Sequence, residues 1–396
     1  MFGILANKRW PIALDLGAQS LKMLQMQRGP SGLSVRASGR YRFPASAAPD
    51  SEDWRRLAVR AVREILAGNG FRGTAVVSAI PSRQLKIRNV RLPGLSPDEM
   101  RQAVQWEAKE RFGCDFTPDR LFHLRAGKVR QGAENCEEVI LLGATAEVVE
   151  GHLALLKAMG LTPERIEAEP LAVFRPFERV LRRRSDSDAV SVIVDTGHTA
   201  TNVVVARGQH VLLIKSLEVG GRDLTQAVAK QLNVSGEEAE ELRVQTFRPP
   251  RVEAGGEAGD QTGDDEAEKP DAAAASDGVN WTVLDAVRGV VEAMTREIAL
   301  CLRYCSVTFR GLRPQRVTVV GGGAYDGALV RRLGEQLGVP CEVGQPLRGL
   351  DTSLVDLGSD RRGVLAEWAV CAGLALHDAP AASNRKAADG QRRLSA

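Results

Sequence analysis

The chain has 396 residues, of which 43% are hydrophobic and 26% are charged. This is the composition of an ordinary globular protein, and the length is sufficient for two domains that each bury a core of their own. A net charge of +3 gives no reason to expect a nucleic acid partner. No apolar run approaches the roughly 18 residues of a membrane-spanning helix. The start of the chain is too short for a signal peptide, so we expect a cytoplasmic protein.

Residues 11–43 predict a meander of three strands. The first strand is apolar and runs into the turn Asp15-Leu16-Gly17, and the second covers 21–26. Apolar residues at helical spacing over 53–66 and a short buried strand over 74–80 follow. Together these elements make one α/β unit.

Residues 83–165 bring new elements before a second unit begins, and we expect them to form a small inserted α+β subdomain. Ser96 as the cap, Pro97 at the first helical position and Glu99 three residues after the cap start a helix. The further elements expected here are strands over 121–129 and 138–144 and a helix over 146–159.

A second meander occupies residues 190–221. Its first strand ends in the turn Asp195-Thr196-Gly197, and strands over 202–206 and 211–217 follow. The two Asp-x-Gly turns lie 180 residues apart (195 − 15), a spacing typical of two related domains in one chain rather than of a solenoid.

The remainder of the chain predicts mostly helices and one further glycine turn. Residues 246–279 are rich in Pro, Gly, Ala and acidic residues, so we expect a disordered acidic loop, and a disordered tail over 378–396. An apolar strand over 316–320 runs into Gly321-Gly322-Gly323. The other elements expected are helices over 166–183, 223–231, 281–304, 326–336 and 366–376, a helix capped by residues 235–238 that includes 239–243, and a strand over 341–343.

A carboxylate at the mouth of a hairpin rich in backbone N–H groups suits a hydrated cation and the phosphates that accompany it. An isolated Asp-x-Gly would more simply be an ordinary turn, and Lys22 an ordinary surface lysine; the second copy of the turn favours the phosphate interpretation. The chain has no P-loop motif, and Gly321-Gly322-Gly323 lacks the third glycine of a dinucleotide fingerprint.

Together these motifs resemble the actin, Hsp70 and sugar kinase superfamily. The resemblance implies two actin-like (ribonuclease H-like) domains around a cleft that holds ATP and Mg²⁺, with the cation bound through water by Asp15, Asp195 and Glu169. It also implies that the nucleotide contacts Asp15, Gly17, Ser20 and Lys22 in the first hairpin, Asp195, Gly197, Thr199, Thr201 and Asn202 in the second, and Glu240, Arg243, Gly321, Gly322 and Gly323.

The branch within this superfamily is indicated by five stretches, which are similar to the PilM family of type IV pilus assembly proteins, relatives of the division protein FtsA. They are residues 92–95, 106–108, 158–161, 219–225 and 237–240. The implied domains are 10–82, completed by 166–185 and 364–377, for the first actin-like domain, 83–165 for the FtsA-like insertion and 186–363 for the second actin-like domain.

This resemblance implies an ATP-binding adaptor of the inner-membrane platform that assembles a type IV pilus, as in twitching motility, or a related type II secretion system. The partner would be the cytoplasmic N-terminal tail of a PilN-like membrane protein, bound in a groove between the insertion and the first domain. The chain would then be cytoplasmic and peripheral to the inner membrane, with homo-oligomer formation left open. Ala18-Gln19 and His198 depart from the usual hairpins, which predicts weak or absent hydrolysis.

Two alternatives remain open at this point. A small-molecule kinase of the same superfamily would need a catalytic carboxylate aimed at a substrate hydroxyl, and the sequence offers no obvious one. An FtsA-like filament former would anchor to the membrane through an amphipathic C-terminal helix, but residues 385–396 have no apolar stripe.

Overall fold

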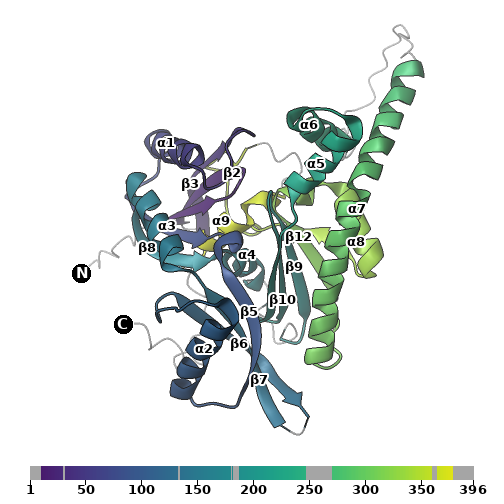
Figure 1. Cartoon of the computed structure of the whole chain (residues 1–396). Coiled ribbons are helices and arrows are strands. Elements are labelled where there is room, and N and C mark those ends of the chain that lie inside the picture. The colour runs from purple at the N-terminus through teal and green to yellow at the C-terminus, as the bar shows by residue number, and fades with distance from the viewer. Residues whose placement is uncertain are drawn as a thin grey trace.

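The computed structural model describes residues 10–29, 32–132, 134–179, 181, 187–246, 270–358 and 364–377. Two five-stranded sheets and one three-stranded sheet organise these residues (Figure 1). Within the described ranges no helix is both long and apolar enough to cross a membrane. The tail expected to be disordered, 378–396, lies outside the described residues, as does the part of the acidic loop from 247 to 269.

The first sheet has the strand order β3-β2-β1-β4-β8, in which β1 to β3 form an antiparallel meander and β4 and β8 run parallel to β1. Helices α1 and α3 pack on one side of it, and α4 and α9 on the other. We call this sheet with its helices the first lobe. Its elements are β1 (Ile12–Leu16), β2 (Ser20–Gly29), β3 (Gly32–Arg42), α1 (Glu52–Gly68), β4 (Ala75–Ile80), α3 (Ala146–Ala158), β8 (Thr162–Ala168), α4 (Glu169–Glu178) and α9 (Ala369–Ala375).

The second sheet repeats this arrangement with the order β11-β10-β9-β12-β13, again a meander followed by two parallel strands. With its helices we call it the second lobe, and α7 runs along its outer side and projects past α6 (Figure 1). Its elements are β9 (Val190–Thr196), β10 (Thr201–Arg207), β11 (His210–Leu217), α5 (Gly221–Leu232), α6 (Gly236–Thr246), α7 (Pro270–Thr308), β12 (Arg316–Val320), α8 (Gly327–Leu337) and β13 (Cys341–Val343).

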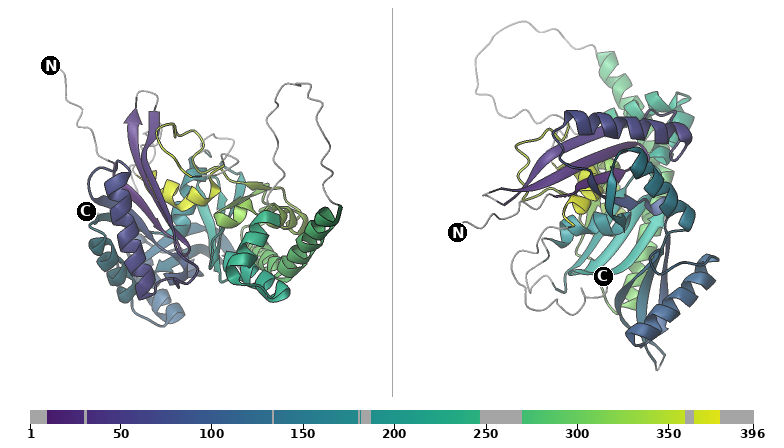
Figure 2. Two further views of the ribbon diagram at one scale, coloured as in Figure 1. Left: turned by 90° about the horizontal axis from the view of Figure 1, so that it is seen from above. Right: turned by 90° about the vertical axis from the view of Figure 1, so that its left-hand side faces the viewer.

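The repeated order confirms the α/β fold class expected from the sequence. Helices α4 and α9 pack against each other between the two sheets, and α4 contacts strands of both lobes. The core around them contains the fully buried Trp368. Two views turned by 90° show the lobes as separate layers on either side of these helices (Figure 2).

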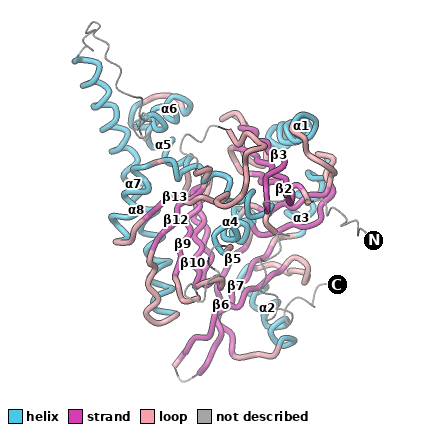
Figure 3. The backbone as a smooth tube through the Cα atoms, turned by 180° about the vertical axis from the view of Figure 1, so that it is seen from behind, coloured by secondary structure: helices cyan, strands magenta, loops and turns pink. Residues whose placement is uncertain are grey.

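The insert is a three-stranded antiparallel sheet, order β5-β7-β6, covered on one face by α2. Its elements are β5 (Lys86–Pro93), α2 (Pro97–Phe112), β6 (Leu121–Gln131) and β7 (Glu134–Gly143). Ser96 and Glu99 form the expected capping box at the start of α2. Seen from behind, the insert extends away from both larger sheets (Figure 3).

The structure differs from the sequence expectation at the end of the insert. Helix α3 packs on α1, β4 and β8, and β8 pairs with β4, so both elements belong to the first lobe and the insert spans 86–143 rather than 83–165. Strand β8 went unrecognised because its residues, Thr-Pro-Glu-Arg-Ile-Glu-Ala, show no apolar alternation.

Two further differences concern element boundaries. Strand β5 was not predicted, although its apolar residues at 87, 90 and 92 are separated by Arg and Asn, because its last two residues were assigned to the turn over 92–95. Helix α7 begins at Pro270, so residues 270–279 are helical rather than part of the acidic loop. The run of four alanines over 272–275 has the highest helix propensity of any residue type, which the overall polarity of the segment concealed.

Candidate functional site

The first hairpin places a buried ion pair where β1 meets β2. Asp15 and Lys22 face each other in the strand register, with Lys22 Nζ 3.4 Å from Asp15 Oδ2, and both side chains are buried. Gly17 forms the turn, where a Cβ would lie 2.7 Å from the Ser20 carbonyl oxygen, so only glycine fits. A buried charge of this kind is tolerated because it has an opposite charge beside it.

The second hairpin repeats this geometry with a neutral partner. Asn202 faces Asp195 in register and donates its amide to Asp195 Oδ2 at 3.3 Å. Burial, together with the carboxylate of Glu169, raises the pKa of Asp195 to about 7. Thr199 lies half-buried in the turn, whereas Thr201 is fully buried and donates its hydroxyl to the Val219 carbonyl at 2.7 Å.

Helix α4 brings a third carboxylate to the same place. Glu169 is its first residue, and Oε2 accepts a hydrogen bond from the Ser82 backbone N–H at 2.6 Å and lies 3.5 Å from Asn202 Nδ2. Burial raises the pKa of Glu169, and the Asp15 carboxylate raises it further. Asp15, Glu169 and Asp195 therefore act on one another electrostatically, with Lys22 as the neighbouring cation.

The predicted glycine turn packs directly against the second hairpin. Gly321 follows β12 with φ +81°, and a Cβ there would lie 2.5 Å from Asp195 Oδ1. A Cβ on Gly323 would lie 2.5 Å from Thr196 Cγ2, while Gly322 is exposed. Two of the three glycines are thus required by close approach to β9.

Helix α6 carries Glu240 and Arg243, and the structure connects Glu240 to the first lobe. Gln19 Nε2 donates to Glu240 Oε1 at 3.0 Å, and Arg42 Nη2 lies 2.6 Å from the same oxygen. Arg243 instead turns to its own lobe, with Nη1 3.6 Å from Asp326 Oδ2. We refer to the Gln19, Arg42 and Glu240 contacts as the latch; nothing in the sequence pattern indicated it.

Three buried polar atoms around the hairpins have no hydrogen-bond partner: Ser82 Oγ, Thr196 Oγ1 and Asn202 Oδ1. Buried polar atoms are normally satisfied, so unpaired ones gathered at one place indicate a site that accepts a polar ligand or water. Among the described residues, no three His, Cys, Asp or Glu side chains are grouped closely enough to hold a metal ion directly.

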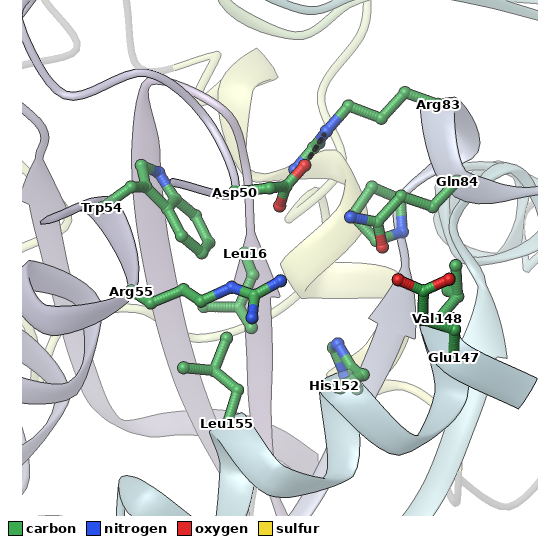
Figure 4. Close-up of a pocket in the computed structure, with 12 residues that line it drawn as sticks. Leu16, Asp50, Trp54, Arg55, Arg83, Gln84, Glu147, Val148, His152 and Leu155 are labelled. Carbon is green, nitrogen blue, oxygen red and sulfur yellow. Dashed lines mark hydrogen bonds and ion pairs between the residues drawn. The ribbon is translucent and has the colours of Figure 1, made fainter. Parts of the chain in front are cut away.

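A separate small cavity of about 50 Å³ lies between α1, the turn over 81–84 and α3 (Figure 4). Arg83 forms two hydrogen bonds of 2.9 Å with Asp50 at its rim. His152 Nε2 lies 2.8 Å from Ser78 Oγ, and burial lowers the pKa of His152 to about 4, so this imidazole is neutral at physiological pH. Trp54 Nε1 donates to the Ala18 carbonyl at 3.3 Å and so connects the cavity to the first hairpin.

Two lobes with the same sheet order, each presenting an Asp-x-Gly hairpin beside a shared central helix pair, define the actin-like fold. Residues 13–253, more than half of the chain, match the model of a family described as type IV pilus assembly protein PilM. The chain belongs to this family, as its sequence motifs had indicated.

Solved structures agree on the fold. A PilM–PilN type IV pilus biogenesis complex is similar over 92% of this chain and 97% of that chain, with 24% identity and a TM-score of 0.71. The ethanolamine utilization protein EutJ from Carboxydothermus hydrogenoformans matches 93% of this chain and 89% of its own at 15% identity and a TM-score of 0.52.

Proposed function

We propose that this protein binds Mg²⁺–ATP between its two hairpins and serves as a cytoplasmic adaptor of an inner-membrane pilus assembly platform. The observation that carries the nucleotide proposal is the convergence of Asp15 with Lys22 and Asp195 with Asn202 from different lobes, beside a glycine turn that only glycine can form. Family membership carries the assembly role.

The residues present fit this ligand. Asn202 Oδ1, Thr196 Oγ1 and Ser82 Oγ are buried without partners, as expected of groups that a ligand or its waters complete. Lys22 would supply positive charge to the phosphates, and the turns with Gly17, Ser20, Gly197 and Thr199 would offer backbone N–H groups. Asp15, Asp195 and Glu169 would hold Mg²⁺ through water, since this ion keeps part of its hydration shell.

The nucleoside would lie toward the second lobe. Glu240 and Arg243 lie on α6, and Arg243 pairs with Asp326, which directly follows the turn segment Gly322–Tyr325, so we assign this part of the second lobe to the ribose and the base. A carboxylate such as Glu240 accepts hydrogen bonds from ribose hydroxyls. Binding, rather than rapid hydrolysis, is the activity we propose, because Gln19 and His198 replace small residues at the two turns.

The partner we propose is the cytoplasmic N-terminal tail of a PilN-like membrane protein, held between the insert and the first lobe. The PilM–PilN complex with a similar fold supports this partner. It would tether the chain to the inner membrane of a type IV pilus or related type II secretion system.

Isothermal titration with Mg²⁺–ATP tests the nucleotide site. We expect Lys22→Ala and Asp195→Asn each to weaken binding by about tenfold or more, since each removes a charge from a buried site. Lys157→Ala and Asp285→Asn, at exposed positions on α3 and α7, are the matched controls. Wild-type affinity in both site variants would reject the site.

Fluorescence anisotropy of a labelled peptide tests the partner. The peptide carries the first 20 or so residues of the PilN-like protein, an extended segment of the length that a groove of this kind accepts. We expect saturable binding to the full chain and none by a scrambled peptide of the same composition. Equal binding of both peptides would contradict specific docking.

A further inference from the structure

A fully buried carboxylate connects the insert to the second lobe. Glu138 on β7 is 0% exposed, and its two oxygens are hydrogen-bonded by residues of both parts. Arg91 Nε lies 3.0 Å from Oε2, Asn89 Nδ2 lies 3.3 Å from Oε1, and the Tyr304 hydroxyl of α7 donates to Oε1. Arg91 also donates to Thr308 Oγ1 of α7 at 3.2 Å. We call these five residues the Glu138 network.

The network is completed only by the second lobe. Burial raises the pKa of Tyr304 to about 12, so its hydroxyl stays protonated and remains a donor to the carboxylate. Separation of the insert from α7 would take the Tyr304 donor from Glu138 and the Thr308 acceptor from Arg91, while Arg91 stays paired with Glu138 inside the insert. Hydrogen bonds to charged groups are among the stronger ones, so their loss opposes separation.

The backbone of the insert is also shaped to fit α7 and β11. A bulge between Arg125 and Gly127 interrupts β6, and a Cβ on Gly127 would lie 3.3 Å from the ring of Phe309, just after α7. Asn89 Nδ2 donates to the Leu212 carbonyl of β11 at 3.4 Å, and β11 contacts all three strands of the insert.

The connection to the first lobe is of another kind. The chain enters the insert before Lys86 and leaves it after Gly143, and these two residues are paired in the sheet register, so the chain passes between the two parts at a single narrow neck. Ala126, Ile140 and Leu142 of the insert also lie in the core cluster that contains residues of α4, α9 and the second sheet. Among the described residues of 86–143, the side-chain hydrogen bonds that leave the insert end on α7 and β11, in the second lobe.

We propose that the insert is a rigid extension of the second lobe, fastened by the Glu138 network and hinged to the first lobe at the neck. Movement of the lobes on nucleotide binding then shifts the insert relative to the first lobe and alters the groove between them. This regulatory consequence rests on the proposed function, whereas the rigid attachment does not. By linkage, the partner tail and the nucleotide change each other's affinity by the same factor.

Distances between paired spin labels test the attachment in the full chain. Labels replace the exposed residues Lys157, Glu110 and Glu335, in the first lobe, the insert and the second lobe, after the partly exposed Cys114 and Cys341 are changed to serine. We expect the Glu110–Glu335 distance to remain constant when Mg²⁺–AMPPNP is added. A change in that distance while Glu110–Lys157 stays constant would overturn the proposal.

Variants of the Glu138 network test the rigid attachment of the insert in the absence of nucleotide. We expect Glu138→Gln and Tyr304→Phe to broaden the Glu110–Glu335 distance distribution, because each weakens the network. Glu137→Gln is the matched control: it neutralises the adjacent residue on β7, whose ion pair with Arg125 stays within the insert. Unchanged widths in both network variants would overturn the attachment even if the proposed function holds.

The regulatory consequence is measured with the labelled tail peptide. In the wild type, the ratio of the peptide's Kd values with and without Mg²⁺–AMPPNP should differ from 1. In Tyr304→Phe the ratio should approach about 1, because nucleotide can change peptide affinity only if the two conformations bind the peptide differently. A wild-type ratio retained in Tyr304→Phe would overturn the regulation. Loss of peptide or nucleotide binding in the wild type would instead refute the proposed function, leaving the attachment to the label distances.

Discussion

The buried position of Asp195 destabilises its ionised carboxylate in the unliganded chain, whereas a bound cation would stabilise that form. Its carboxylate is buried with one amide donor from Asn202 and with Glu169 nearby, and its pKa is raised to about 7. A carboxyl group whose pKa is raised on folding contributes stability below its unfolded pKa and loses that contribution as the pH rises through the folded value. The ionised form, which would serve a cation, is therefore the destabilising one.

Replacing Asp195 with Asn should stabilise the unliganded chain at neutral and higher pH. At about pH 8 we expect a gain on the order of 1–3 kcal/mol in the free energy of unfolding, which shrinks toward about pH 5 as the wild-type carboxyl becomes protonated. Thermal melts of both chains across this range measure it. A gap that does not depend on pH would show that ionisation of Asp195 is not its source.

Nucleotide binding should have the opposite pH dependence. A hydrated Mg²⁺ favours ionised Asp195, so the affinity for Mg²⁺–ATP should rise with pH, by at most about tenfold per unit for one proton, and level off above about pH 8. Titration calorimetry at several pH values measures this, and the residual binding of Asp195→Asn should vary less. His152 does not contribute, since its pKa of about 4 lies below this range.

At the residue scale, the groups within repeated motifs could be predicted from the residues themselves. Glu169 and Glu240 were predicted only through the family resemblance, and their pairings across the chain were not predicted. Asp15, Asp195 and the glycines could be found because two local patterns have the same form. The contact from Ser82 to Glu169 spans 87 residues and that from Gln19 to Glu240 spans 221, and no local pattern carries such pairings.

At the scale of elements, the latch joins the first hairpin and β3 to α6. Gln19 lies 3.0 and 3.3 Å from the two oxygens of Glu240, so its amide occupies the carboxylate that we assign to the ribose. The first hairpin and the nucleoside would then compete for one acceptor. The role of Gln19 in this turn would then be to occupy the Glu240 carboxylate until the nucleoside replaces it.

We therefore expect Gln19→Ala to speed nucleotide association by about threefold to tenfold, because a hydrogen bond to a charged group no longer has to be broken. Stopped-flow fluorescence with a labelled ATP analogue measures the rate. Gln84→Ala, in the turn beside the separate cavity, is the control. Slower association or weaker binding in Gln19→Ala would indicate instead that this amide contacts the nucleotide.

Strands β5 and β8 were not predicted from the sequence, and they have one property in common. Strands β5 and β8 are polar over much of their length, and β8 is the edge strand of its sheet with a proline near its start. Such strands are defined by pairing with a neighbour, which periodicity along one segment does not reveal. The central strands β1 and β9, buried along their length, were predicted from their apolar runs.

At the scale of the molecule, the two lobes repeat one sheet order, and the insert interrupts only the first. Because Lys86 and Gly143 are paired, the insert can be removed without separating the residues on either side of it. Helix α3 and strand β8 come after this point and complete the first lobe, so the place of excision decides whether the remainder can fold.

Replacing residues 86–143 with a short Gly-Ser linker of about four residues, a hairpin-sized connection, should leave two folded lobes that bind Mg²⁺–ATP with an affinity within about threefold of the wild type. The Tm should fall, because Ala126, Ile140 and Leu142 are removed from the core around α4 and α9. Removal of 83–165 should instead prevent folding, since it deletes all of α3 and the first four residues of β8 and so exposes much of the edge of β4. Circular dichroism and calorimetry distinguish the two chains, and the shorter excision should abolish binding of the tail peptide; undiminished binding would place the docking site on the lobes themselves.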